Sequence, residues 1–401
     1  MKKSVLLLSV SLLTLVVCRP LFAEESDASG ASSRAANTPS ADAATLENDG
    51  EGESRFNYGG EVNTHFQAEM NKPSNASAKG NAYNDTDLSL YGNYSSWLSL
   101  NSDMKLERNR NDNMNDYYPD RNTFFRSEGL TLRQMYATVR PVENVAVYGG
   151  KIHPNFGSAY EQTPGIFYNF GTDYEQDERI GVGAQYRLPD VGVIKNVRLS
   201  FEGYYLDTSF LSTSLISQPA LDDPNADRLR KYTRGAFGPS NTGGLDSFTA
   251  ALRGGKTEQG LTYQASLTRE ATDDPAGKTE TGESVGASYN PGGDGIPLTS
   301  RIGVTPFLEY THFDNFQNID NLERHYVVGG LAFSEGRWGL NLAGGLRQSE
   351  GASQDTDHQE NLTLTYELAE HLEIGGGINH TNIANVGSWG FGPSLSYTLA
   401  F

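Results

Sequence analysis

The chain has 401 residues, of which 37% are hydrophobic and 20% charged, and it contains 44 Gly and 21 Tyr. The mean hydropathy is −0.52 and the formal net charge is −19, which argues against the basic face that nucleic-acid binding requires. The single cysteine, Cys18, lies near the N-terminus, so the remainder of the chain can form neither a disulfide nor a cysteine metal site.

Residues 1–23 have the organisation of a secretory signal peptide. Lys2 and Lys3 form a positive start, residues 5–17 form an apolar run, and residues 21–23 (Leu-Phe-Ala) fit a cleavage site. The run is shorter than the ~20 residues of a membrane helix, and no other stretch qualifies. We therefore expect an exported protein without a spanning helix. Its mature charge is −22, because three of the 31 basic residues and none of the 50 acidic ones lie in the signal.

Residues 24–56 are rich in Ser, Ala, Asp and Glu, with almost no bulky apolar side chain before Phe56. Such a composition cannot bury enough apolar surface to order itself. We predict a flexible acidic leader here, and a partner-binding segment is the alternative.

From Tyr58 onward, segments of about ten residues alternate between apolar and polar positions. In Tyr58–Met70 the even side carries Val62, Phe66 and Met70, and the same period of two recurs in residues 87–100, 301–310, 338–346, 362–368 and 372–378. This period is typical of strands with one apolar face. In a membrane barrel the two faces cancel in any hydropathy window, so a low mean hydropathy does not exclude one.

The connectors between these segments alternate in length. Short ones are predicted at Asn101–Asp103 and Ala369–Glu370, among others, and longer ones include Pro154–Asp177, Leu211–Gly244, Ser349–Asp357 and Thr381–Ser388. This layout predicts an all-β fold, a transmembrane antiparallel β-barrel over residues 57–401. Our count is sixteen strands, with fourteen and eighteen as alternatives, and sixteen strands enclose an aqueous lumen.

One connector has unusual chemistry. The stretch from Ile152 to Glu178 holds no Lys or Arg, but it contains the aromatic residues Tyr160, Phe167, Tyr168, Phe170 and Tyr174 and the acidic residues Glu161, Asp173, Glu175, Asp177 and Glu178. Carboxylates gathered in a narrow pore attract cations. The alternative is that these acids form a solvated loop face.

Basic residues occur in the predicted strands beside this connector, namely Arg133, Lys151, Arg179, Arg187 and Arg198. Arg179 and Arg187 share the odd phase, opposite an apolar even face, and Arg198 likewise alternates with Val197 and Leu199. These phases predict that the three arginines face the lumen. The phase of Arg133 is ambiguous, because neither face of Leu130–Val139 is cleanly apolar.

The last eleven residues alternate strictly. Every odd position from Phe391 to Phe401 is bulky and every even one is small. This segment resembles the final strand of bacterial outer-membrane β-barrel proteins, which the barrel-assembly machinery reads through its terminal aromatic residue. The resemblance implies that Tyr397, Leu399 and Phe401 form an assembly signal. An edge strand of a soluble sheet is the alternative.

The chain as a whole resembles the porins of the Gram-negative outer membrane. The signal peptide and the final strand carry this resemblance, together with residues 147–157 (Val-Tyr-Gly-Gly-Lys-Ile-His-Pro-Asn-Phe-Gly). That segment is similar to the stretch of general and phosphate-selective porins where the fifth strand enters the third outer loop, which folds inward and sets the constriction. The connector lacks the basic residues that phosphate selectivity would require.

The porin resemblance implies a homotrimer that works without a cofactor in a membrane of lipid and lipopolysaccharide, with residues 24–56 in the periplasm. The function predicted from it is passive diffusion of small hydrophilic solutes and ions, with a preference for cations. Alternatives are a substrate-specific channel or receptor for a siderophore or sugar, and a non-conducting structural or adhesive barrel.

No enzymatic motif is present in the sequence. There is neither a phosphate-binding loop nor a G-x-S-x-G elbow. The seven His residues are scattered, and none recur at the H-x-x-x-H spacing of zinc ligands, so the spacing predicts no metal site.

Overall fold

The computed structural model describes residues 56–108, 123–125, 128–167, 169–190, 195–217, 232–255, 260–291 and 295–401. All of them belong to one compact unit, Ser32–Phe401. The predictions for residues 1–23, for the leader up to residue 55 and for Tyr168 lie outside the described residues. Within the described ranges, no helix has the length and apolar character needed to cross a membrane.

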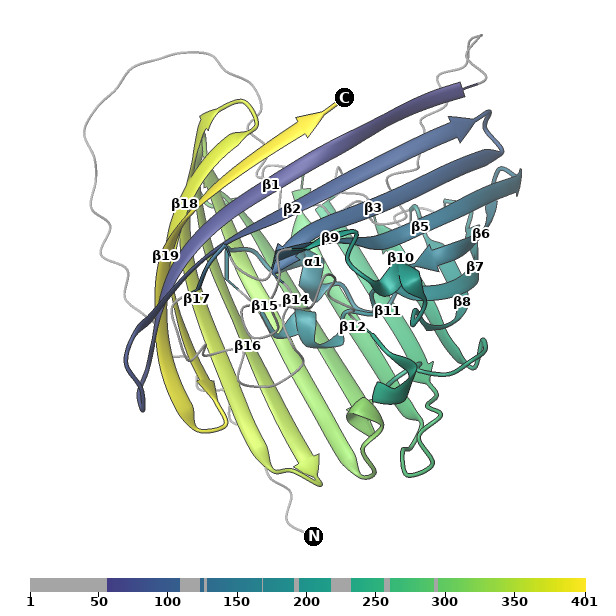
Figure 1. Ribbon diagram of the computed structural model, residues 1–401. Coiled ribbons are helices and arrows are strands. Elements are labelled where there is room, and N and C mark those ends of the chain that lie inside the picture. Colours follow the sequence, from purple (N-terminus) through teal and green to yellow (C-terminus); the bar gives the residue numbers. More distant parts are fainter. Residues whose placement is uncertain are drawn as a thin grey trace. The chain divides into compact units, whose positions relative to one another are not determined.

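Sixteen long strands of the described chain form one closed antiparallel sheet, as predicted (Figure 1). Each pairs with the next long strand along the chain. They are β1 (Phe56–Pro73), β2 (Lys79–Tyr94), β3 (Leu98–Arg108), β5 (Glu128–Val142), β6 (Val145–Ile152), β7 (Arg179–Arg187), β8 (Arg198–Leu206), β10 (Ser247–Gly255), β11 (Gly260–Glu270), β12 (Glu280–Asn290), β14 (Gly303–Asp314), β15 (Leu322–Glu335), β16 (Trp338–Gly351), β17 (Asp355–Ala369), β18 (Leu372–Ile383) and β19 (Val386–Ala400).

Shorter elements lie in the connectors. They are the two-residue strands β4 (Thr123–Phe124), β9 (Ile216–Ser217) and β13 (Ile296–Pro297), the helix α1 (Ala159–Gln162), and the 3₁₀ turns η3 (Phe170–Tyr174), η4 (Phe210–Ser212), η5 (Arg234–Ala236) and η8 (Phe316–Asn318).

The barrel closes where β1 pairs with β19, with a register that aligns Glu61 with Ala400 and Phe66 with Leu395. At the end of this ladder the amide of Gly60 donates to the carbonyl of Phe401 at 2.9 Å, and the amide of Phe401 donates back at 3.0 Å. A Cβ atom at Gly60 would lie 2.7 Å from the Phe401 ring. Glycine at this position therefore lets the terminal aromatic side chain lie against β1.

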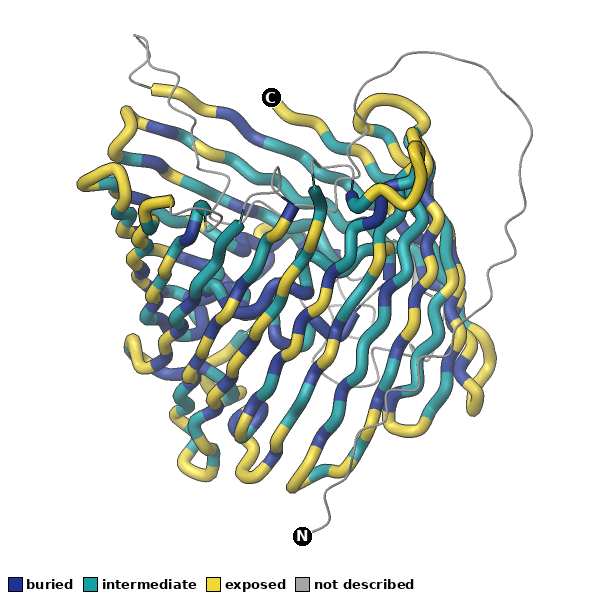
Figure 2. Tube along the Cα trace, turned by 180° about the vertical axis from the view of Figure 1, so that it is seen from behind, coloured by how far each residue is buried: buried dark blue, intermediate teal, exposed yellow. Residues whose placement is uncertain are grey.

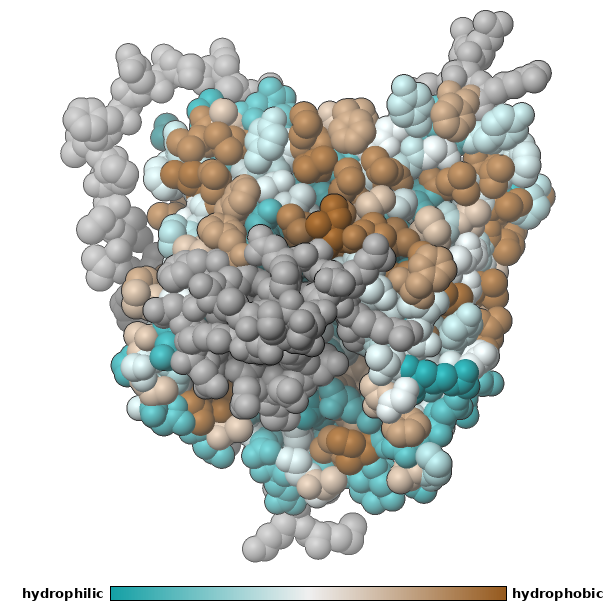
Figure 3. All heavy atoms as spheres, viewed as in Figure 1, coloured by the Kyte–Doolittle hydropathy of each residue, from teal (hydrophilic) through white to brown (hydrophobic). Residues whose placement is uncertain are grey.

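The predicted alternation is visible along the strands as a regular change of burial (Figure 2). In β14, Leu308 is 61% exposed, whereas its neighbour Glu309 is 1% exposed. In β19, Phe391, Tyr397 and Leu399 are exposed, as their odd phase predicts. Apolar side chains gather on the exterior of the barrel (Figure 3). The opposite side of the sheet, which carries Glu309, is called the inner face below.

One predicted turn is wrong. Residues Asn101–Asp103 lie within β3, and the chain turns instead at Ser95–Trp97, where Ser95 has a φ of 61°. The register aligns Gly92 of β2 with Leu100 of β3. Even positions of β2 are therefore aligned with even positions of β3. The alternation continues in phase through the turn, so the sequence pattern does not reveal the turn. The connectors predicted at 349–357 and 381–388 are also shorter, at 352–354 and 384–385.

A bulge explains the ambiguous phase of Arg133. Asp103 is aligned with Gln134, and the next residue, Met104, is aligned with Leu132. Arg133 is thus an extra residue in β5, and an extra residue shifts the alternation by one position. Residues before and after it follow different phases, so a single period of two does not describe the strand.

The two faces of β16 should respond differently to charge. Leu342 lies in an outward row with Leu331 and Leu362, whereas Asn341 belongs to the inner face. An arginine on the lipid side of a membrane barrel costs ~2–4 kcal/mol near the bilayer midplane. We expect Leu342→Arg to lower the free energy of unfolding by about this amount, and Asn341→Arg to change it little. Urea titration of the protein in lipid vesicles measures both, and equal effects would contradict the assignment of the faces.

Candidate functional site

The acidic connector links β6 to β7 and is called the β6–β7 segment (residues 153–178) below. It is not extended. Pro154 and Pro164 lack the amide that a strand requires, and the chain forms α1 and η3 instead. The side chain of Asn169 starts η3 by accepting a hydrogen bond from the amide of Gly171 at 2.8 Å. The segment therefore folds into short turns, and its polar groups contact other strands.

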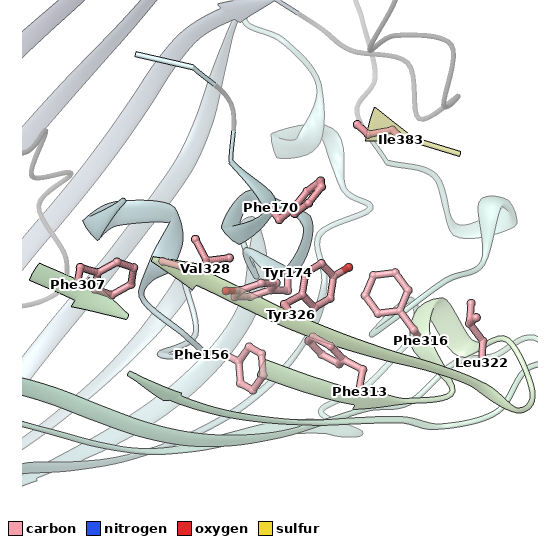
Figure 4. Close-up of a cluster of buried hydrophobic side chains, with 11 residues drawn as sticks. Phe156, Phe170, Tyr174, Phe307, Phe313, Phe316, Leu322, Tyr326, Val328 and Ile383 are labelled. Atoms are coloured by element: carbon pink, nitrogen blue, oxygen red, sulfur yellow. The ribbon is translucent and has the colours of Figure 1, made fainter. Parts of the chain in front are cut away.

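Aromatic side chains pack the β6–β7 segment against β14 and β15. Phe156 and Tyr174 of the segment point toward Phe313 and Tyr326 of these strands (Figure 4). The ring centroids of Tyr174 and Tyr326 are 5.0 Å apart, and those of Phe156 and Phe313 are 5.4 Å apart. Such pairs contribute about 0.5–1.5 kcal/mol each beyond the burial of their area.

A buried carboxylate fixes the start of α1. Glu309 accepts hydrogen bonds from the amide and hydroxyl of Ser158 at 2.7 Å, and from the amide of Ala159 at 3.0 Å. It also accepts from the hydroxyl of Tyr174 at 2.8 Å and the amide group of Gln264 at 2.9 Å. Hydrogen bonds to a charged acceptor are about twice as strong as neutral ones. Glu309 therefore holds both turns of the segment to the wall.

Further hydrogen bonds connect the β6–β7 segment to other strands of the inner face. Asn155 donates to Glu202 of β8 at 2.5 Å. Gln176 donates to Thr268 of β11 at 2.9 Å. In the middle of the segment, the amide of Ile166 donates to Thr363 of β17 at 3.4 Å. The contacts thus reach strands that are well separated in the order around the barrel.

Three basic wall residues pair with the acidic residues of the segment. Arg133 of β5 bonds to Glu175 and, at 3.0 Å, to Asp177. The ammonium group of Lys151 lies 2.9 Å from both Glu178 and Asp207. Arg347 of β16 lies 2.7 Å from Asp173 and 2.6 Å from Asp357 of β17.

These contacts, called the ion-pair network below, share one composition. Each of the three basic residues bridges two carboxylates, so six carboxylates meet three cations. Lys151, Glu178 and Asp207 are at most 1% exposed. Charges in such a place are costly to bury and depend on one another. The network therefore holds the segment in place, and among the described side chains it contains more carboxylates than cations.

The three other predicted basic residues, Arg179, Arg187 and Arg198, have different surroundings. Arg179 lies 3.2 Å from Glu270 and donates to the backbone carbonyl of Asp177 at 2.8 Å. Arg198 is aligned with Arg187 on β7 and with Arg253 on β10. Three arginines of adjacent strands therefore form a row, which we call the arginine row.

The first turn of the segment lies next to the arginine row. Arg253 donates to the carbonyl of Gly157 at 2.9 Å and faces Tyr160 and Glu161. Burial raises the pKa of Glu161, and Arg253 opposes that shift. Burial lowers the pKa of His153 to about 4, while Glu175 works against it. His153 is therefore neutral at pH 7, and Glu161 is harder to ionise than a carboxylate in water.

Several residues of the site escaped the sequence-based predictions, namely Asp207, Arg253, Glu309, Arg347 and Asp357. The sequence pattern does contain a signal for one of them, Arg347. Arg347 has the odd phase of β16, opposite Leu340, Leu342 and Leu346, which places it on the inner face. Arg347 pairs with Asp173, which is 174 residues away in the sequence. The sequence does not predict this partner, because the contact depends on how the segment folds.

Lys151 offers a test of the ion-pair network. Lys151→Met removes the cation from two buried carboxylates, and breaking a buried pair in this way costs about 3–5 kcal/mol. We expect this loss in the free energy of unfolding, measured by urea titration in vesicles. Arg187→Met is the matched control because Arg187 is exposed. Equal stability of the two variants would show that the network does not hold the segment.

No protein-family model and no curated protein matches the chain. Solved structures do match it. The outer membrane channel DcaP of Acinetobacter baumannii is 14% identical, with a TM-score of 0.54 over 86% of this chain and 97% of that one.

Two further structures each match 86% of this chain and 100% of their own length. The anion-selective porin from Comamonas acidovorans is 13% identical with a TM-score of 0.52, and the trimer form of OmpT from Vibrio cholerae is 9% identical with a TM-score of 0.50. At such identities the likeness shows the fold, which is the closed barrel of outer-membrane porins.

Proposed function

We propose that the chain forms a channel in the outer membrane of a Gram-negative bacterium, through which small hydrophilic solutes and ions diffuse passively. The inner face carries this proposal. It is lined by polar and charged side chains, as the buried residues Gln264, Thr311 and Gln359 illustrate, and a barrel of sixteen strands is wide enough to hold water. The likeness to an outer membrane channel and a porin supports the same function.

In this proposal the β6–β7 segment is the inward-folded third outer loop that narrows the pore. Its contacts support this, because they lie on the inner face and reach from β5 to β17. Tyr160, Glu161, Asp173, Tyr174, Glu175, Asp177 and Glu178 then belong to the constriction, and Tyr168 is assigned to it from the sequence alone. Arg133, Lys151, Arg179, Arg187 and Arg198 are its basic wall.

We propose that the ion-pair network gives the channel its preference for cations. With six carboxylates and three cations, the network leaves negative charge beside the segment, and a narrow, low-dielectric passage focuses the field of such charges. The arginine row contributes positive charge on β7, β8 and β10. We propose that the surplus in the network exceeds the effect of the row, and that solutes cross a transverse field between the two.

Planar-bilayer recordings test both parts of this proposal. The purified protein should give stable conductance steps, and a protein without conductance would contradict the channel. In a salt gradient the reversal potential should have the sign of cation preference. The preference should be strongest near ~0.01 M salt, where the Debye length is ~30 Å, and should fade near ~1 M, where it is ~3 Å.

A triple variant links that selectivity to the segment. Glu161→Gln, Asp173→Asn and Glu175→Gln together remove two carboxylates from the network and one beside Arg253, so the reversal potential should move toward zero. The control neutralises three exposed acids outside the segment, Asp320, Glu335 and Glu370. If both triple variants keep the wild-type potential, the segment does not set selectivity, and an anion-selective wild type would mean that the arginine row dominates.

The alternative of a sugar or siderophore receptor gains no support from three aromatic residues of the segment. Phe156, Phe170 and Tyr174 are at most 4% exposed and pack against the wall. They are therefore not available as a surface on which a sugar ring could stack. A non-conducting structural or adhesive barrel is the other alternative, and the bilayer recordings separate it from the channel.

Export, assembly and oligomeric state complete the proposal. Residues 1–23 direct export, and residues 24–56 remain in the periplasm. The barrel is inserted among lipid and lipopolysaccharide and assembles as a homotrimer, for which the trimer form of OmpT gives support. The mass of the detergent-solubilised complex checks the trimer.

The barrel-assembly machinery should read Tyr397, Leu399 and Phe401, whose side chains are all exposed. Phe401→Asp places a charge at the inferred recognition element and should reduce the amount of protein in the outer membrane several-fold. The control Thr398→Asp lies on the inner face of the same strand. Immunoblots of membrane fractions measure both variants, and normal levels of Phe401→Asp would contradict the assembly signal.

A further inference from the structure

Two groups of ionisable side chains lie on the exterior of the barrel, away from the proposed pore. The first, called site A, joins β14 and β15. His312 and His325 are aligned across the two strands, and their rings stack with centroids 4.5 Å apart. Glu323 precedes His325 by two positions and so shares its face of the strand. One ligand atom from each of the three residues lies within 4.8 Å of the others.

The second group, called site B, joins β17 and β18 in a similar way. His358 and Glu360 are two positions apart on β17, and Glu360 is aligned with His380 on β18. The Nδ1 atom of His380 lies 2.9 Å from a carboxylate oxygen of Glu360. Again one ligand atom from each residue lies within 4.8 Å of the others. The same trio of residue types therefore occurs twice, each time across one strand pair.

Both sites lie at the same end of the barrel. Site A adjoins the connector 315–321 and site B adjoins the connector 384–385, and both connectors lie at the same end of the strands. Along β14 the outward positions run from Leu308 to Tyr310 and then His312, and along β17 from Leu364 to Leu362 and then Glu360. Each site thus begins where the outward apolar residues end, and Glu323 and Glu360 are exposed there. Dissolved ions can reach both sites.

We propose that sites A and B each bind a divalent transition-metal ion of the zinc type. Two imidazole nitrogens and one carboxylate oxygen are a common zinc ligand set, and they leave one position for water. Imidazole ligands favour such a metal over calcium or magnesium, which prefer oxygen ligands. At site A two further carboxylates, Glu283 and Asp314, lie 3.6 and 3.7 Å from the nitrogens of His312. A bound ion would join neighbouring strands near the rim.

The H-x-x-x-H spacing fails to reveal these sites because it describes a helix. In a strand, residues two apart share a face, and aligned residues of the neighbouring strand lie about 4.5–5.5 Å away between Cβ atoms. The pairs Glu323/His325 and His358/Glu360 have the strand spacing. Their histidine partners come from the adjacent strand, which only the register identifies.

The test is a zinc titration by isothermal calorimetry, with full-length, tag-free protein in detergent. Wild type should bind two ions per chain, His325→Ala and His380→Ala one each, and the double variant none. His65→Ala and His371→Ala remove histidines outside both sites and should still bind two. Heat-modifiable migration on gels checks that every variant retains the barrel, and His312→Ala replaces His325→Ala if the latter does not fold.

Two further measurements complete the test. Cobalt should give a visible absorption band in wild type that is lost in the double variant, and zinc should raise the melting temperature of wild type but not that of the double variant. Wild type without zinc binding, or undiminished binding in the double variant, would overturn the proposal. Neither measurement depends on conductance, so a failed channel and a failed metal site are distinguished.

Discussion

The closed hydrogen-bonded ladder is the constraint on which the rest of this structure depends. Because β19 pairs with β1, these two strands close the described sheet and form backbone hydrogen bonds with each other along the seam instead of leaving two open edges. Closure also divides the side chains into an outward and an inward set. The outward set is mainly apolar, as Leu308 and Phe391 show, whereas buried polar groups such as Gln264 and Glu309 belong to the inward set.

An inner face of this kind cannot be stabilised like an ordinary core. Its largest buried side chains include Lys151, Glu202 and Glu309, and each needs a partner because an unpaired buried charge is costly. The β6–β7 segment supplies these partners. Its carboxylates meet Arg133, Lys151 and Arg347, while its amides meet Glu309. The same contacts that position the segment thus define the charge beside it.

On the exterior, strand register places ionisable side chains next to one another. Between the apolar outward positions and the connectors, strands β14, β15, β17 and β18 carry histidines and carboxylates in register. The strand ladder fixes their separation without any further support. A rigid sheet can therefore hold ligand sets on its surface as readily as a helix can, although with different sequence spacing.

The sequence by itself determined the class of fold and the outward face of the final strand, because period-two alternation is a local property of the chain. It predicted sixteen strands, with fourteen and eighteen as alternatives. It could not locate the turn at Ser95–Trp97, where the register keeps the alternation in phase, or the phase of Arg133, where a bulge interrupts it.

Only the tertiary structure decided which charges meet. Asp173 and Arg347 are 174 residues apart, and their contact depends on how the β6–β7 segment folds. The pairing of His312 with His325 in site A and of Glu360 with His380 in site B likewise depends on strand register. Alternation assigns a side chain to a face, but neighbours on that face are set by hydrogen bonds between strands and by the packing of Phe156 and Tyr174, which link residues distant in sequence.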